Sequence, residues 1–123
     1  MNSSIVIGLR PQSYLIRMAV FLIVIASCAM AQGQTVDDYF DSGNSKFSLQ
    51  NYKGAIADFT KAIELNPYNL YLAYYNRGRS KNGLQDYNGA IADYTKSIEL
   101  EPNHADAYNN RGYSKDELLD HNG

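Results

Sequence analysis

The feature that most constrains this chain is an internal repeat. Residues Gly54–Pro67 read GAIADFTKAIELNP and residues Gly89–Pro102 read GAIADYTKSIELEP, so 11 of 14 positions are identical at a separation of 35 residues. A period in the range of roughly 20 to 50 residues is typical of folds in which each unit buries its apolar face against its neighbours rather than around one centre. The chain is therefore expected to present an extended surface that binds other molecules.

Apolar residues in each copy recur at spacings of three and four, which predicts helices and no strands. The apolar positions are Ala55, Ile56, Phe59, Ala62 and Ile63 in the first copy and Ala90, Ile91, Tyr94 and Ile98 in the second. The charged residues at intervening positions are Asp58, Lys61, Glu64, Asp93, Lys96 and Glu99. We expect them to form weak pairs on the surface.

The ends of the predicted helices are marked by residues suited to them. Pro67 and Pro102 disfavour helical geometry at the residue before them and so end one helix of each unit. Asn51 and Asp86 lie in the turn between the two helices of a unit, and their side chains are suited to cap the second helix. A group of aspartates near residue 37 is suited to the first turn of a helix, where the helix dipole favours negative charge.

This pattern resembles the tetratricopeptide repeat, whose signature over about 34 residues places an aromatic, a glycine, an alanine, an aromatic and a proline in order. The matching residues are Tyr39, Gly43, Ala55, Phe59 and Pro67, then Tyr74, Gly78, Ala90, Tyr94 and Pro102, then Tyr108 and Gly112. The leucine position of the signature holds Ser42, Arg77 and Arg111, and the second aromatic position holds Lys46, Lys81 and Lys115.

The resemblance implies an all-α fold, in which antiparallel helix-turn-helix repeats stack as a short right-handed α-solenoid of about two and a half units. It also implies that the matching residues pack the repeats, with each glycine where the two helices of a unit approach closely. The predicted divisions are residues 1–31, 32–35 as a linker, 36–70 and 71–104 as two units, and 105–123 as the first helix of an incomplete third unit or a C-terminal cap. Because the sequence stops within the third copy of the motif, we favour a fragment of a longer repeat protein over a capped one.

Residues 1–31 are predicted to be an export signal. Arg10 and Arg17 provide a basic start, residues 18–26 form a short apolar run, and Ala29 and Ala31 offer a cleavage site. Two alternatives remain, namely a lipoprotein signal in which Cys28 becomes lipid-anchored, and an uncleaved membrane anchor. The expected location is therefore periplasmic, secreted or associated with the envelope.

Composition excludes several classes of function. Cleavage after Ala31 would remove the single cysteine and leave 9 basic against 13 acidic residues, a net charge of −4. No segment carries a basic cluster, so nucleic acid is not an expected partner. His104 and His121 stand apart from other ligand-type residues and are interpreted as polar surface residues. We therefore predict no catalytic residue, no metal and no cofactor.

The resemblance places a binding groove along the first helix of each repeat. The residues expected to contact a peptide or protein partner are Asn44, Tyr75, Asn76, Arg79, Asn110 and Tyr113. Other groove positions are Asp37, Phe40, Phe47, Leu72, Asp106 and Asn109. One subfamily grips the C-terminal carboxylate of chaperones with three cations and two asparagines. Asn44 and Asn76 match those asparagines, but Phe40, Asp106 and Asn110 replace the cations, so this mode is not expected.

Three functional hypotheses follow. The first is a non-catalytic scaffold that binds a peptide segment or partner protein in the groove. The second is the repeat arm of a larger envelope enzyme or assembly protein. The third is a self-associating module that pairs through the open last repeat near Leu118 and Leu119.

Overall fold

The computed structural model describes residues 12–24, 33–68 and 70–122. It divides into two compact units, Met1–Gly33 and Gln34–Gly123. In the first unit, residues 12–24 form an exposed helix. Among the described helices, none combines the length and the apolar character that a membrane crossing requires. Cys28 and the predicted cleavage site after Ala31 lie outside the described residues.

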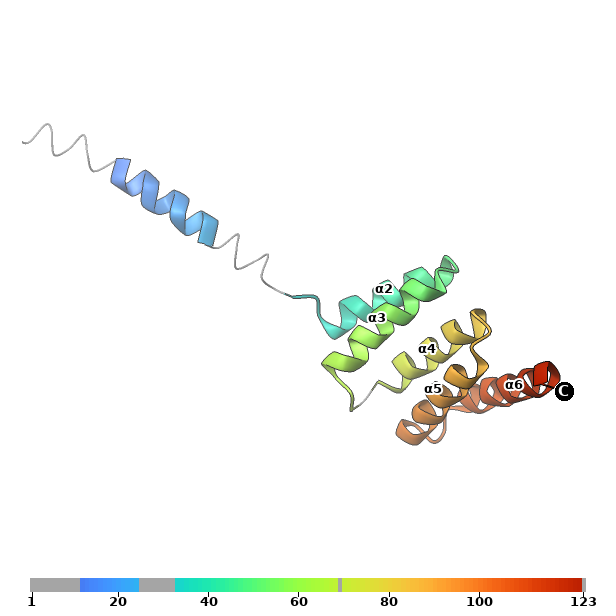
Figure 1. Ribbon diagram of the computed structural model, residues 1–123. Coiled ribbons are helices and arrows are strands. Elements are labelled where there is room, and N and C mark those ends of the chain that lie inside the picture. Colours follow the sequence, from blue (N-terminus) through green and yellow to red (C-terminus); the bar gives the residue numbers. More distant parts are fainter. Residues whose placement is uncertain (1–11, 25–32, 69, 123) are drawn as a thin grey trace, which may run out of the picture. The chain divides into compact units, whose positions relative to one another are not determined.

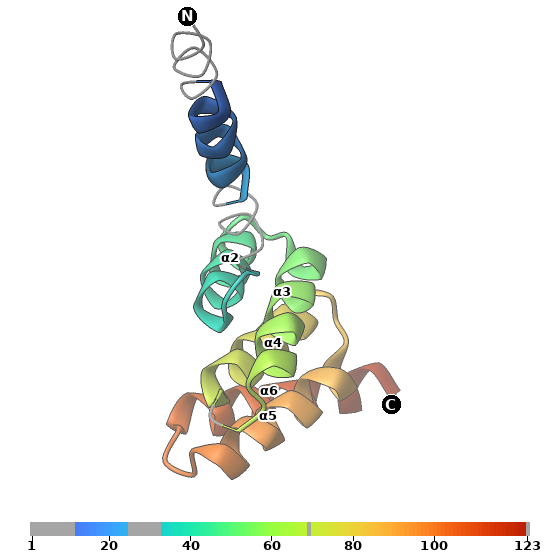
Figure 2. The same ribbon diagram turned by 90° about the vertical axis from the view of Figure 1, so that its left-hand side faces the viewer.

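The second unit is built from α-helices that follow one another in chain order (Figures 1 and 2). They are α2 (Val36–Ser48), α3 (Tyr52–Leu65), α4 (Tyr71–Gly83), α5 (Tyr87–Leu100) and α6 (Ala105–Asn122). Each helix packs on the next, and α4 also contacts both α2 and α6. The described part of this unit contains no strand. The predicted all-α solenoid of antiparallel helix pairs is confirmed.

The predicted helix ends are also confirmed. The Gly54 N–H donates to Asn51 Oδ1 at 3.1 Å, and the Gly89 N–H donates to Asp86 Oδ1 at 3.0 Å. These bonds satisfy donors that the first turn of a helix leaves unpaired. At the other end, α3 is followed by Asn66 and α5 by Glu101. Both residues leave the helical conformation, as expected for a residue that precedes proline. The N-cap of α2 was not predicted; there Thr35 and Asp38 form a reciprocal capping box.

The two helices of each repeat cross at a glycine that lies against an aromatic ring. A Cβ built on Gly43 would lie 2.7 Å from the Phe59 ring, and one built on Gly78 would lie 2.8 Å from the Tyr94 ring. Both rings are fully buried. Only a residue without a side chain allows the helices to approach this closely.

Gly112 does not occupy such a crossing, contrary to the sequence-based expectation. A Cβ at this position would meet no atom within 4 Å. Tyr108, also expected to pack between helices, is 44% exposed. The reason is that no described helix covers the face of α6 that corresponds to the covered faces of α2 and α4.

Alanine substitution should therefore have opposite effects at matched glycines. Gly78→Ala forces a methyl group into the Tyr94 ring and should lower the free energy of unfolding by about 1 to 3 kcal/mol. Gly112→Ala meets open space and should raise it by up to about 1 kcal/mol, because alanine favours helix. Urea unfolding followed by circular dichroism measures both; a stabilised Gly78→Ala variant would contradict the crossing.

The expectation that Asp58 and Asp93 are surface residues is wrong. Both residues are buried, at 9% and 4% exposure. Asp58 pairs with Lys46 at 2.7 Å and accepts a hydrogen bond from the Ser42 hydroxyl at 2.6 Å. The exposed pairs predicted beside them, Lys61 with Glu64 and Lys96 with Glu99, are present. An acidic side chain can lie on the buried face of a helix when a cation on the neighbouring helix neutralises it, so charge alone does not show which residues are exposed.

Asp93 is held by two cations. Arg77 Nη2 lies 2.7 Å from Asp93 Oδ1, Arg77 Nε donates to Oδ2 at 2.8 Å, and Lys81 Nζ lies 2.8 Å from Oδ2. Burial on its own lowers the pKa of Arg77, but the hydrogen bonds to Asp93 and the attraction of its negative charge together outweigh burial, and the net pKa is raised. The residues at the leucine and second aromatic positions of the motif thus form a buried polar link within each of the first two repeats.

Removing one partner of this link should be costly. Asp93→Ala leaves Arg77 and Lys81 without their carboxylate and should reduce the free energy of unfolding by about 3 kcal/mol. Glu99→Ala is the matched control, because Glu99 forms an exposed pair on the same helix. The two variants are compared by urea unfolding. Equal midpoints would show that the buried link does not support the fold.

The link in the first repeat should make stability depend on acid pH. Burial alone raises the pKa of Asp58, but the hydrogen bonds from Lys46 and Ser42 together with the positive charge of Lys46 outweigh it, so the folded pKa lies below 3.8. A depressed folded pKa adds stability above the unfolded pKa of about 3.9, and this contribution disappears as pH falls through the folded value. Melting temperatures between pH 6 and pH 2, measured for wild type and Asp58→Asn, should decline more steeply for wild type. Parallel curves would contradict the assignment.

Candidate functional site

A hollow of about 200 Å³ spans the first helices of all three repeats. It is lined by Phe47 of α2, Arg79 and Asn82 of α4, Asn110 and Tyr113 of α6, and Tyr94 of α5. Three of these residues, Arg79, Asn110 and Tyr113, were predicted as groove contacts from the sequence. Because helices from successive repeats contribute side chains to one surface, the hollow depends on the stacking of the repeats.

Amide side chains connect the first helices along this surface. Asn76 Nδ2 donates to Asn44 Oδ1 at 3.0 Å and joins α4 to α2. Asn110 Nδ2 donates to the Tyr75 hydroxyl at 2.9 Å and joins α6 to α4. An amide side chain has two N–H donors and a carbonyl acceptor, so each keeps further capacity for hydrogen bonds. The structure thus brings these four predicted residues together in two pairs.

Arg79 places a positive charge among aromatic rings. Its guanidinium carbon lies 4.4 Å from the centre of the Phe47 ring and 5.7 Å from that of Tyr75. Stacking on two rings restricts the arginine side chain while its hydrogen-bond donors stay at the exposed surface. Burial raises the pKa of the Tyr75 hydroxyl above its ordinary value.

Asn82 and the second role of Tyr94 were not predicted from the sequence. Asn82 Nδ2 donates to the Tyr94 hydroxyl at 3.2 Å, and Asn82 Oδ1 accepts from the Ser114 hydroxyl at 2.8 Å. Asn82 lies three residues after Arg79, so the helical spacing alone could have placed it on the groove face. Tyr94 was assigned only to packing, yet it also lines the hollow, and its hydroxyl accepts the hydrogen bond from Asn82.

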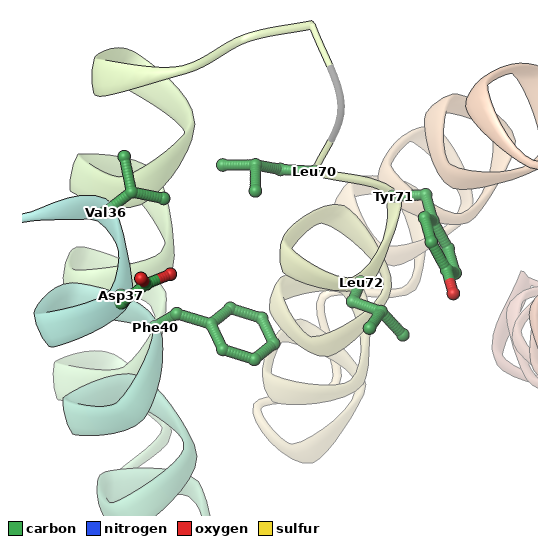
Figure 3. A pocket seen from close by; sticks show the side chains of 6 residues that line it. All are labelled: Val36, Asp37, Phe40, Leu70, Tyr71 and Leu72. Atoms are coloured by element: carbon green, nitrogen blue, oxygen red, sulfur yellow. The ribbon is translucent and has the colours of Figure 1, made fainter.

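A second, mostly apolar hollow of about 190 Å³ lies between the starts of α2 and α4 (Figure 3). Its lining residues are Val36, Asp37, Phe40, Leu70, Tyr71 and Leu72. Phe40 and Leu72 were expected at groove positions, and Leu72 is 41% exposed. This hollow could accept an apolar side chain of a ligand whose main chain follows the groove.

His104 is not the free surface residue expected from the sequence. Its ring lies edge-on to Tyr75, with centres 4.5 Å apart, and to Tyr71, with centres 5.2 Å apart. His104 Nδ1 also lies 3.3 Å from the buried hydroxyl of Ser97. This packing holds Tyr75 in place beneath the groove. In the described part of the chain, no group of three or more His, Cys, Asp and Glu side chains is arranged to hold a metal.

Comparison with known sequences identifies the repeats. Three sequence models described as Tetratricopeptide repeat match residues 39–69, 71–104 and 93–123. The chain is a tetratricopeptide repeat protein. A search of curated proteins found no significant match.

Solved tetratricopeptide repeat structures resemble this protein in fold. The Arabidopsis OM64 TPR domain is 27% identical, with a TM-score of 0.66, covering 68% of this chain and 69% of that one. The second TPR domain of human RPAP3, in complex with the HSP70 peptide SGPTIEEVD, is 30% identical, with a TM-score of 0.63 and the same two coverages. The first TPR of RPAP3, bound to the HSP90 peptide SRMEEVD, is 26% identical, with a TM-score of 0.65, covering 71% of this chain and 70% of that one.

Proposed function

We propose that this protein is a non-catalytic scaffold that binds an extended peptide segment of a partner protein along α2, α4 and α6. The observation that carries the proposal is the hollow in which the stacked Arg79 and the exposed Tyr113 face polar groups of Asn82 and Asn110. The proposal is supported by structural relatives with the same fold that were solved with bound peptides.

The groove residues suggest how a peptide is held. Amide side chains such as those of Asn44 and Asn76 pair with backbone N–H and C=O groups of an extended chain. Arg79 offers a pre-positioned cation for a carboxylate or carbonyl of the ligand. Tyr113, which is 55% exposed, offers a ring face for an apolar side chain. The ligand class is therefore a peptide with mixed apolar and acidic side chains.

A chaperone C-terminal tail is not the proposed ligand. The subfamily that grips such tails uses three cations, and Phe40, Asp106 and Asn110 stand at those positions here. Asp106 would repel a terminal carboxylate, whereas Asn44 and Asn76 of that arrangement are present and bonded to one another. The groove of this protein thus keeps the amide part of that arrangement and lacks its charge.

The experiment is a selection of peptides from a random library against the full chain, followed by affinity measurements with the selected peptides. Arg79→Ala and Tyr113→Ala should each weaken binding about tenfold or more, since each removes a contact at the centre of the groove. Lys53→Ala is the matched control, because Lys53 is exposed on α3, outside the groove. Unchanged affinity in both groove variants would contradict the proposal.

The peptide SRMEEVD separates this proposal from the chaperone mode. We expect no binding that depends on its terminal carboxylate, so the free-acid and amidated forms should behave alike in calorimetry with the full chain. Tighter binding of the free acid, lost in Asn44→Ala, would assign the groove to terminal carboxylates instead.

We also propose that residues 1–31 direct export of the chain. The support is the sequence alone, namely the basic start, the short apolar run and the small residues before Gln32. Mass spectrometry of the mature protein after expression in a bacterial host tests it. A mass beginning at Gln32 supports cleavage at Ala31, a lipid-modified Cys28 supports anchoring, and an intact cytoplasmic chain would contradict export.

A further inference from the structure

The two hollows described above lie on one shared face of α2 and α4. We call them the apolar hollow, which Phe40 and Leu72 help to line, and the arginine hollow, which contains Arg79. Residues three and four apart lie on the same side of a helix. At these spacings the face carries Phe40, Asn44 and Phe47 on α2 and Leu72, Asn76 and Arg79 on α4. The first residue of each set lines the apolar hollow, the last lines the arginine hollow, and the asparagines between them bond to each other.

The apolar hollow is open because of the residues at this junction between repeats. In the register of the repeat, Val36, Phe40 and Leu70 at the first junction correspond to Tyr71, Tyr75 and His104 at the second. At the second junction the imidazole ring lies edge-on to both tyrosine rings, with centres 4.5 and 5.2 Å apart. At the first junction Leu70 brings no ring, and a hollow of about 190 Å³ remains between α2 and α4 (Figure 3). The filled junction indicates that the open one accepts a ring or a branched apolar side chain of similar size.

The two hollows differ in charge. The exposed carboxylate of Asp37 lies at the apolar hollow. Arg79 lies at the other hollow, stacked on Phe47, and within the described ranges it forms no ion pair. An acidic group of a ligand is therefore attracted to the arginine hollow and repelled from the apolar one.

The separation of the hollows defines the conformation of the ligand. Leu72 and Arg79 are seven residues apart in α4, which is a rise of about 10 Å. In a polyproline II segment every third side chain points the same way, at a distance of about 9 Å. In a β-strand the side chains on one face are about 7 or 13 Å apart, at spacings of two or four residues. The polyproline II spacing fits best, and its backbone has no internal hydrogen bonds, so it is free to pair with Asn44 and Asn76.

We propose that the face shared by α2 and α4 binds a polyproline II segment in which an apolar and an acidic residue stand three positions apart. The apolar side chain enters the apolar hollow and the carboxylate meets Arg79. The main chain between them pairs with the amide groups of Asn44 and Asn76. This inference rests on the peptide-binding function proposed above and adds the sequence pattern and conformation of the ligand.

The test uses fluorescent peptides with a polyproline host, titrated with the full chain and followed by anisotropy. The first probe is Pro-Pro-Phe-Pro-Pro-Glu-Pro-Pro, and the second has Phe and Glu exchanged, because the direction of the chain is not part of the proposal. We expect saturable binding in at least one order. Peptides in which one or three prolines separate Phe from Glu should bind about tenfold more weakly, since only one of the two side chains then reaches its hollow.

Leu72→Asp tests the apolar hollow, because it introduces the residue that stands at the corresponding position of α6, Asp106. Leu72 is 41% exposed, so the fold should tolerate the change, and circular dichroism checks this. Binding of the Phe probe should weaken about tenfold, whereas a probe with Ala in place of Phe should bind both proteins alike. Arg79→Gln should likewise abolish the difference between probes with Glu and with Gln. Leu65→Asp is the matched control, since Leu65 is exposed on α3 outside the groove.

The outcomes separate this inference from the proposed function. Equal binding at all spacings, tightest binding at a spacing of two or four, or equal weakening by Leu72→Asp and Leu65→Asp would overturn the inference. Library-selected peptides that depend on Arg79 and Tyr113 would then leave the proposed function in place. If neither the library nor the polyproline probes bind, both proposals are wrong.

Discussion

The close crossing of two helices at a glycine is the contact on which the rest of this structure depends. At Gly43 and Gly78 the absence of a side chain lets an aromatic ring of the partner helix lie directly on the backbone. This close contact sets how the two helices of a repeat pair. It also brings the side chains one turn away, including those of Lys46 and Lys81, within reach of the buried aspartates. The groove then follows, because paired helices of constant geometry stack with their first helices side by side.

The polar link beside each helix crossing is built from different residues in the first two repeats. Where the family signature has apolar residues, the first repeat uses Ser42 and Lys46 around Asp58, and the second uses Arg77 and Lys81 around Asp93. A buried ion pair adds less stability than apolar packing of the same volume, but it penalises partners that lack the matching charge. In the first two repeats it specifies which helix can pair with which.

Much of the fold could be predicted from the sequence because it depends on local patterns. Helical spacing, the caps at Asn51 and Asp86 and the breaks before Pro67 are determined by nearby residues. The burial of Asp58 and Asp93 was missed because it depends on cations that lie 12 to 16 residues away on another helix. Gly112 was misassigned for the same reason, since a residue type cannot reveal whether a second helix covers it.

The candidate site was predictable in its positions and not in its contacts. The repeat register placed Asn44, Asn76 and Asn110 on the first helices, but it gave no sign that Asn44 and Asn76 bond to each other. Nor did it show that His104 packs on Tyr75 or that Asn82 reaches Tyr94. The bond between Asn44 and Asn76 joins two repeats, so it depends on the angle at which repeats stack. The other two contacts lie within the second repeat and depend on how its helices pack rather than on any local pattern.

Amide hydrogen exchange of the full chain, resolved by helix, tests the central claim most directly. A first helix should be stabilised where a second helix packs on its glycine. Amides of α4 around Gly78 should therefore exchange much more slowly than those of α6 around Gly112. The two helices share the sequence Asn-Arg-Gly at this point, so local sequence effects largely cancel. Equal protection of the two segments, or greater protection in α6, would contradict the account.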